Sequence, residues 1–292
     1  MADKQAISVG VDLGGTNMAA GVLKGDKLLN RDKKKTKADE GPEKVIKRLV
    51  KLVEDVIDNA KVDRKDVRSV GVGAPGAINP ETGEVIKAVN LRWDNLPLAK
   101  ELEKALDLPV VVDNDVNVGA WGEFRAGAGK KHDELLAVFV GTGIGGGLVL
   151  NGRLYHGTMG TAGEIGHTLA KPDAPLGRRT LENLASRTAM VNLITQLIES
   201  NHDSVITEIT DGDLSKVRSK VLAEAVERKD PLATRVIREA AGYVGNACAD
   251  VVTLLSLPCV VIGGGMAEAM GKTYVKWVRE AFDEHVFPPD LK

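Results

Sequence analysis

Cysteine is scarce in this chain, and both cysteines, Cys248 and Cys259, stand in apolar stretches of the sequence. A disulfide framework is therefore not expected, and this composition fits a cytoplasmic setting. No Cys-x-x-Cys pair occurs anywhere, so a zinc ribbon is excluded because its ligands are missing.

Long apolar runs and an excess of charge of one sign are also missing. No run approaches the roughly 20 apolar residues of a membrane-spanning helix, and the start of the chain, Met1 to Lys4, has no signal-peptide core. With a formal net charge of −2 there is no electrostatic reason to expect nucleic acid as a partner. The basic cluster Lys33 to Lys37 is interpreted as a solvated loop or strand edge.

What is present describes an ordinary globular protein. The chain has 292 residues, of which 43% are hydrophobic and 27% charged. This length allows two lobes, each with its own core. Strand-like apolar runs mix with helical patterns in the first part, whereas Ser186 to Glu199, Leu214 to Glu227 and Pro231 to Leu255 are predicted to be helical.

Two glycine-rich turns between strand-like runs dominate the sequence. Gly141 to Gly147 separates two apolar runs, and Gly14-Gly15-Thr16 separates two more near the N-terminus. A turn with so few side chains leaves backbone N–H groups uncovered, which suits a loop that closes on phosphate oxygens. The pair suggests two lobes that face one polyanion.

Other glycine patterns are false matches. Gly141-x-Gly143-x-x-Gly146 and Gly71-x-Gly73-x-x-Gly76 fit the dinucleotide fingerprint, but neither leads into the helix that must hold the pyrophosphate. Gly265 to Thr273 resembles a P-loop with one residue too many between its glycines.

Four polar or small-residue positions are candidates for chemistry. Asp12 ends the first strand, where a carboxylate suits Mg²⁺ or its water, although an Asx turn would look the same. The run Asp113 to Asn117 follows a buried strand and precedes a helix that is expected from Val118 to about Ala126. N-capping of that helix explains one of these polar residues, and the others favour a functional site at the end of the strand. Glu164 and His167 form either a site pair or a surface pair. The turn Gly263 to Gly265 suits the adenosine part of a nucleotide.

These pieces together resemble the ROK family of bacterial sugar kinases, in family order over nearly the whole chain. The matching segments are Val9 to Thr16, Gly73 to Gly76, Asn114 to Asn117, Gly141 to Gly147, Gly163 to His167 and Gly263 to Gly265. The resemblance implies an α/β, two-lobed, actin-like (ribonuclease H-like) ATPase fold with the active site in the interlobe cleft. The expected lobes are residues 1–115, with the first phosphate loop and the sugar loops, and residues 116–292, with the second phosphate loop and the adenosine side.

The resemblance also implies roles for individual residues. Asp115 looks like the catalytic base, and Asp12 like the Mg²⁺ position, through water. The substrate-contacting positions implied are Gly76, Asn90, Asn114, Asp115, Glu164, His167 and Glu182. The nucleotide-contacting positions implied are Asp12, Gly14, Gly15, Thr16, Asn17, Thr142, Gly143, Gly264 and Gly265.

The chain departs from the family pattern in two places. Most members carry three cysteines between the equivalents of His167 and Glu182 that form a zinc site with the histidine. Here residues 168–181 contain no cysteine, so zinc is not expected, and the alignment of Glu182 is less secure than that of Glu164. The family also continues with a glycine-containing segment and a last helix that packs on the first lobe, whereas this sequence stops at Lys292.

The expected activity is transfer of the γ-phosphoryl group of ATP, with Mg²⁺, to the 6-hydroxyl of glucose or a related hexose, with closure of the lobes excluding water. Polyphosphate as donor, and N-acetylmannosamine, mannose, fructose or allose as acceptor, stay open. A non-sugar actin-like ATPase would not need the Glu164 and His167 pair. A sugar-responsive regulator would need a helix-turn-helix segment ahead of the first strand, where this sequence has only Met1 to Ala6. A homodimer is expected from the resemblance.

Overall fold

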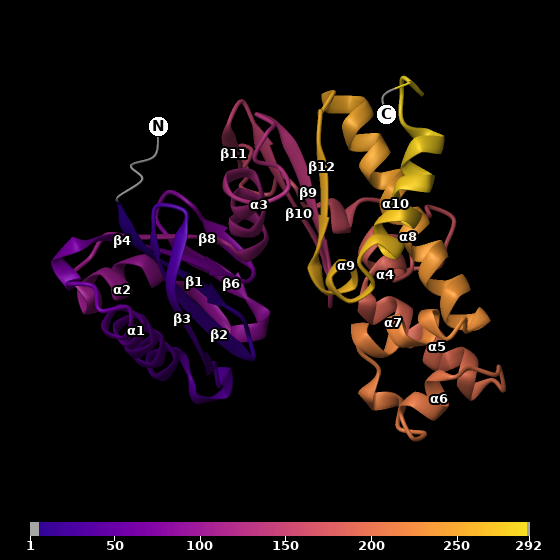
Figure 1. The fold of residues 1–292 in the computed structure, drawn as a ribbon, viewed down its shortest axis with the longest axis horizontal. Helices are drawn as coiled ribbons and strands as arrows, with labels where there is room; N and C mark the ends of the chain where they lie inside the picture. The colour runs from indigo at the N-terminus through magenta and orange to yellow at the C-terminus, as the bar shows by residue number, and fades with distance from the viewer. Residues whose placement is uncertain (1–5, 291–292) are drawn as a thin grey trace. The chain divides into compact units, whose positions relative to one another are not determined.

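The computed structural model describes residues 6–290 of the chain. The segment Met1 to Lys4, where no signal-peptide core was expected, and the end at Lys292 lie outside the described residues. The described chain forms two compact α/β units (Figure 1). The first holds the residues up to Gly122 together with 156–162, and the second holds 123–155 and the residues from Gly163 on. The lobe boundary was expected after residue 115, at the start of the helix Asp115–Arg125. In the structure the two units divide after Gly122, within that helix.

The first unit is built on a five-stranded sheet in the order β3-β2-β1-β4-β8. Its strands are β1 (Ile7–Leu13), β2 (Asn17–Lys24), β3 (Lys27–Lys35), β4 (Val67–Ala74) and β8 (Val110–Asn114). Strands β1, β4 and β8 are parallel neighbours, whereas β2 pairs antiparallel with β1, and β3 pairs antiparallel with β2. Because β3 is an edge strand, the basic residues at its end lie on a solvated sheet edge, as the sequence indicated.

One face of this sheet is covered by α1 (Pro42–Asn59) and α2 (Leu98–Leu106). Alternate residues of β1, namely Val9, Val11 and Leu13, are buried against the apolar stripe of α1. Proline at the first position of α1 suits a helix start because its missing N–H would have no helical partner there. A small antiparallel sheet of β5 (Ala77–Asn79), β6 (Glu84–Ala88) and β7 (Trp93–Leu96) completes the unit together with the first turns of α3 (Asp115–Arg125).

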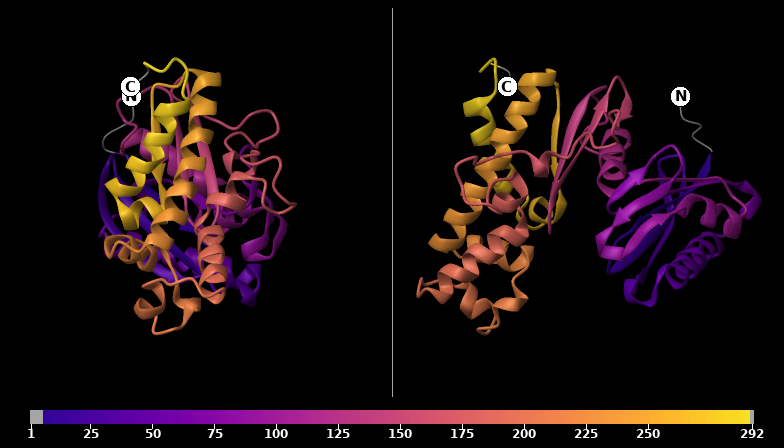
Figure 2. Two further views of the ribbon diagram at one scale, coloured as in Figure 1. Left: turned by 90° about the vertical axis from the view of Figure 1, so that its right-hand side faces the viewer. Right: turned by 180° about the vertical axis from the view of Figure 1, so that it is seen from behind.

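The second unit has a four-stranded sheet in the order β11-β10-β9-β12 and a helical part. Its strands are β9 (Leu135–Val140), β10 (Ile144–Leu150), β11 (Arg153–Tyr155) and β12 (Val260–Gly263). Its helices are α4 (Leu181–Ala185), α5 (Arg187–Glu199), α6 (Ile206–Ile209), α7 (Ser219–Glu227), α8 (Pro231–Leu255), α9 (Gly264–Met270) and α10 (Lys272–His285). The long helix α8 lies alongside α10 and packs its buried stripe into the same core as β9 and β10 (Figure 2).

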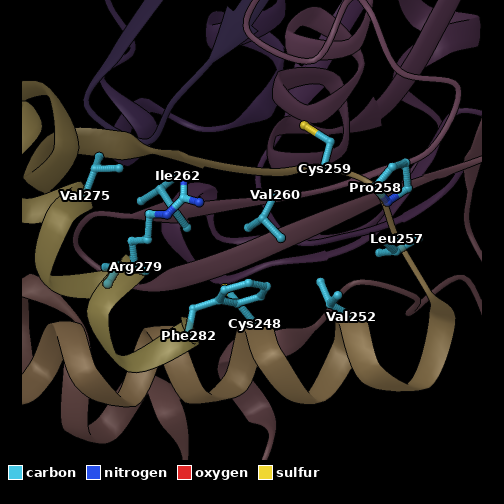
Figure 3. A pocket seen from close by; sticks show the side chains of 11 residues that line it. Cys248, Val252, Leu257, Pro258, Cys259, Val260, Ile262, Val275, Arg279 and Phe282 are labelled. Carbon is cyan, nitrogen blue, oxygen red and sulfur yellow. The ribbon is translucent and has the colours of Figure 1, made fainter. Parts of the chain in front are cut away.

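An apolar cavity of about 370 Å³ lies between α8, α10 and β12 (Figure 3). Val252, Val260 and Phe282 line it together with Cys248, and Arg279 is its one charged lining residue. None of the residues that the sequence placed in the functional site lines this cavity. None of the helices among residues 6–290 is long and apolar enough to cross a membrane.

Two helix predictions need correction. The helix expected from Leu214 is broken, because Asp213 caps a short turn and Arg218 is fully extended, so that α7 begins only at Ser219. The helix expected from Val118 begins instead at Asp115, because the side chain of Asn114 accepts hydrogen bonds from the N–H groups of the next turn. By contrast, the predicted helix Pro231 to Leu255 is confirmed at both ends.

Candidate functional site

The parallel strands of the first unit end at one edge of the sheet and carry polar residues there. In the strand register Asp12 of β1 lies opposite Gly73 of β4, and Gly73 lies opposite Asp113 of β8. Asp12 and the run from Asp113 to Asp115 therefore stand two strands apart at the same carboxyl edge. In α/β proteins this edge is where ligands bind.

Asp12 is a carboxylate at the end of β1. Its residue is exposed, yet the surrounding protein displaces enough water to raise the pKa of this carboxyl above its ordinary value of 3.8. Such a group gains from a nearby cation, and carboxylate oxygen is a ligand that Mg²⁺ prefers. Asp12 therefore fits the Mg²⁺ position that the sequence assigned to it.

The first glycine turn is held tightly from two sides. Gly14 N–H donates to Asn17 O at 3.0 Å, and the hydroxyl of buried Thr36 donates to Gly14 O at 2.6 Å. A Cβ atom on Gly14 would lie 2.8 Å from Asn17 O, and one on Gly15 would lie 3.0 Å from Asn90 Cβ. Only glycine lets the turn approach its neighbours this closely. Thr16 and Asn17 are exposed beside it, and Asn90, predicted to contact the sugar, is in contact with this turn.

Asp113 is the centre of a hydrogen-bond network. Its Oδ2 accepts from His156 Nε2 at 2.7 Å, and its Oδ1 accepts from the N–H of Asn114 at 2.7 Å and from Asn117 Nδ2 at 3.2 Å. The side chains of Asp113 and His156 are only 17% and 28% exposed. Both oxygens of Asp113 thus accept hydrogen bonds from within the protein.

Asp115 is the first residue of α3 and is half-buried. Its Oδ1 accepts from the N–H of Val116 at 2.9 Å, which fixes the carboxylate at the helix start. Asn114 uses its amide twice: Oδ1 caps α3, and Nδ2 donates to Gly76 O at 3.0 Å. Gly76 has φ of +98° and a Cβ there would meet Lys87 O, so this predicted substrate position requires glycine.

The second glycine turn, between β9 and β10 of the second unit, is anchored by the start of α5. Gly141 N–H donates to Gly143 O at 2.9 Å, and Gly141 O accepts from the N–H of Arg187 at 2.9 Å. Arg187 Nη2 donates to Thr142 Oγ1 at 2.6 Å, and Thr188 Oγ1 donates to Thr142 O at 2.7 Å. A guanidinium therefore lies on the hydroxyl of the turn that the sequence predicts to hold phosphate.

Glu182 lies directly behind the same turn. Its Oε2 accepts from the N–H of Ile144 at 2.8 Å, and a Cβ on Gly143 would collide with that oxygen. Glu182 was expected to contact the sugar. In the structure one of its oxygens braces the second glycine turn, a contact that the sequence did not indicate.

Glu164 and His167 lie on a short helical turn that follows Gly163. Glu164 Oε2 and His167 Nε2 are 3.8 Å apart, and the two side chains are 54% and 73% exposed. Gly163 has φ of +90° and packs on Gly146 of β10. The pair is thus presented to solvent from a segment that is fastened to the sheet, which is how a binding pair would be displayed.

The turn predicted for the adenosine side begins α9. Gly264 has φ of +82°, and a Cβ there would lie 2.7 Å from Val140 N, at the end of β9. Gly265 follows with Ser219 Oγ 3.3 Å from its Cβ position. The second unit therefore brings Gly264 and Gly265 next to the strand that leads into the second glycine turn.

Three residues of these arrangements were missed by the sequence reasoning: Thr36, His156 and Arg187. Each acts on a partner far along the chain, and no spacing motif marks such a pair. The nearest signal is the polar run Ser186-Arg187-Thr188 directly after the helix that holds Glu182. Within the described part of the chain, no three His, Cys, Asp or Glu side chains gather as metal ligands; the expected absence of zinc stays a prediction.

Comparison with known proteins decides the family. The model of the ROK family matches residues 8–290. This chain belongs to the ROK family. The chain is similar to the glucokinase of Halalkalibacterium halodurans. The two sequences are 33% identical over 287 residues, which cover 96% of this chain and 86% of that protein.

A solved structure of the family is similar over almost the whole molecule. A ROK family glucokinase from Streptomyces griseus, solved in complex with glucose and AMPPNP, has 31% identity and a TM-score of 0.84, covering 98% of this ROK protein and 91% of that chain. The predicted actin-like α/β fold is thereby confirmed. The family is not confined to enzymes: a xylose repressor of Caldicellulosiruptor bescii is 30% identical over 255 residues, covering 86% of this chain and 63% of the repressor.

Proposed function

We propose that this ROK protein is an ATP-dependent hexose kinase that phosphorylates glucose, or a closely related hexose, at the 6-hydroxyl. Similarity to glucokinases over nearly the whole chain supports the activity and the sugar class. The observation that carries the assignment of the site is the shared carboxyl edge of β1, β4 and β8, with Asp12 on one strand and Asp115 directly after another.

Asp115 is the general base in this proposal. It accepts the proton of the sugar hydroxyl as that oxygen attacks the γ-phosphorus and the bond from phosphorus to the bridging oxygen breaks, so that ADP leaves with the electron pair. Asp113 cannot share this role because His156, Asn114 and Asn117 occupy its oxygens. Instead, it holds the start of α3, and hence Asp115, in place.

The two glycine turns supply phosphate contacts. In the first turn Gly14 N–H is bonded to Asn17 O, so the N–H groups proposed to meet phosphate are those of Gly15 and Thr16. The turn at Thr142 adds the guanidinium of Arg187, whose remaining donors suit phosphate oxygens. Asp12 would hold Mg²⁺, directly or through water; Mg²⁺ neutralises charge on the phosphates when bound. Glu164, His167 and Asn90 are the side chains proposed to bind sugar hydroxyls.

The test measures ADP release with Mg²⁺-ATP against a panel of hexoses and N-acetylhexosamines. Asp115→Asn should lower kcat by about 10²- to 10⁴-fold, the usual contribution of a general base, while sugar affinity stays close to that of the parent. Asp26→Asn, an exposed carboxylate in the turn at the other end of the same sheet, is the matched control and should keep full turnover. Near-normal kcat in Asp115→Asn would refute the base assignment.

The phosphoryl donor is tested in parallel, because polyphosphate and ATP present the same terminal group to the acceptor. Turnover with polyphosphate and not with ATP would replace the donor while keeping the acceptor site and its base. A sugar-responsive regulator is the second candidate, favoured by the similarity to a repressor. Sugar binding without turnover on any donor would support the regulator and refute the kinase.

A further inference from the structure

A polar hollow of about 350 Å³ opens beside the first glycine turn. Its lining includes Gly15 and Thr16 of the turn, Lys35 and Lys37 from the end of β3, and Asn90 and Arg92 from the loop before β7. All of these residues belong to the first unit. The hollow thus extends one wall of the predicted phosphate site.

The charge of the hollow is positive. Lys35, Lys37 and Arg92 line it against one carboxylate, that of Asp39. Lys37 reaches Glu40 at 3.4 Å, but none of the ion pairs among residues 6–290 involves Lys35 or Arg92. Lys34 shows the contrast: the next residue along the strand, it pairs with Asp55 of α1 at 2.5 Å. Two cations of the hollow therefore have their charge available for a ligand.

Two of the three cationic residues of the hollow have a strained backbone. Lys37 has φ of +52° and Arg92 has φ of +58°, the left-handed region that non-glycine residues seldom adopt. Strained residues persist where the surroundings fix them, and they gather at binding sites.

A buried threonine fixes the Lys37 side of the hollow to the glycine turn. Thr36 N–H donates to Thr16 O at 2.9 Å, and the Thr36 hydroxyl donates to Gly14 O. Arg48 in turn donates to Thr36 O at 2.6 Å and to Glu40 at 2.7 Å. Lys35 and Lys37 are thus carried by a braced segment, and the positions of their backbones relative to the glycine turn are preorganised for an anion.

We propose that the hollow formed by Lys35, Lys37 and Arg92 is a subsite for a phosphate-bearing polyanion that continues from the first glycine turn. The proposal rests on the proposed function only in taking that turn as a phosphate site. The same chemistry has two sources, the phosphate tail of a nucleotide and a chain of inorganic polyphosphate. Several cations in one hollow suit a ligand with several adjacent charges.

The test is calorimetric titration of the full chain with sodium tripolyphosphate in the absence of nucleotide. Arg92→Gln and Lys35→Gln should each weaken binding by about five- to tenfold, the effect of losing one charge-assisted contact at an exposed site. Lys33→Gln removes the same charge two residues away on the same exposed strand, outside the hollow, and should leave the affinity within twofold. All three side chains are exposed, so the melting temperature should not change.

Parallel titrations with ATP and with AMP distinguish the two sources. Loss of ATP and tripolyphosphate affinity together, with AMP unaffected, identifies the nucleotide tail; loss for tripolyphosphate alone identifies the inorganic chain. Equal affinities in Arg92→Gln, Lys35→Gln and Lys33→Gln would overturn the proposal, as would absence of tripolyphosphate binding to the parent.

The kinase assay separates this subsite from the proposed function. A protein without turnover on any sugar whose tripolyphosphate affinity still depends on Arg92 would lose the kinase assignment and keep the subsite. A working kinase whose turnover and tripolyphosphate affinity ignore Arg92 and Lys35 would keep the assignment and lose the subsite.

Discussion

The hydrogen bond between His156 and Asp113 is a feature on which the geometry at Asp115 depends. In His156→Ala the Oδ2 atom of Asp113 loses its partner at 2.7 Å, while Oδ1 keeps the N–H of Asn114 and the amide of Asn117. The carboxylate is only partly exposed, so water replaces the imidazole incompletely. We therefore expect the free energy of unfolding to fall and the start of α3 to be held less firmly.

The magnitude follows from the contact. A hydrogen bond to a charged group contributes about 1.5–3 kcal/mol, and exposure of 17% and 28% for the two side chains places this one near 1.5 kcal/mol. For a protein of 292 residues that loss lowers Tm by roughly 2–3 °C. Turnover should fall less than in Asp115→Asn, because the base itself remains.

The assay is urea unfolding of His156→Ala, Asp113→Ala and the double variant. The cycle should return a coupling energy of about 1–2 kcal/mol. His202→Ala is the matched control, since that exposed imidazole follows α5 and bonds only the carbonyl of Leu197 in the last turns of that helix, and it should stay within about 0.5 kcal/mol of the parent. A coupling energy near zero, or equal losses in His156→Ala and His202→Ala, would refute the reasoning.

Three further expectations follow from the structure. Gly264→Ala should destabilise the protein by more than about 2 kcal/mol in urea unfolding, because φ is +82° and the new Cβ would meet the backbone of β9. Gly242→Ala, in α8, has no atom within 4 Å of its Cβ position apart from its chain neighbours and the backbone of its own helix, and should instead stabilise by about 0.5–1 kcal/mol. The reverse order of the two variants would contradict the strain argument. Asp12→Asn should raise Tm at pH 7, because the raised pKa of Asp12 means that its charged form costs stability in the folded protein. The gain in Tm should shrink as the pH falls toward 3.8, and a gain independent of pH would count against this reasoning. Burial raises the pKa of the Cys248 thiol to about 12 and also raises the pKa of Cys259, so a thiol reagent at pH 8 should modify Cys248 only on unfolding; rapid labelling of both in the native protein would be inconsistent with this burial.

Local sequence determined the parts of this protein whose physics involves only neighbouring residues. The first glycine turn is an example, because a Cβ on Gly14 would lie 2.8 Å from the backbone oxygen of Asn17, three residues along the chain. Helix α8 was predicted at both ends because proline suits its first turn and an apolar stripe recurs at helical spacing up to Leu255. The actin-like fold was expected only because the motifs, in their order along the chain, resemble the ROK family, and the comparisons confirm it.

Tertiary structure decided which polar groups meet. His156 reaches Asp113 across 43 residues, and Glu182 reaches the N–H of Ile144 across 38. A propensity or a spacing rule describes a segment by its own residues, whereas these contacts depend on how strands and helices are packed. The same holds for the hollow at Lys35 and Arg92: the sequence shows two cations far apart, and only the folding of β3 and the loop before β7 around the first glycine turn brings them to one place.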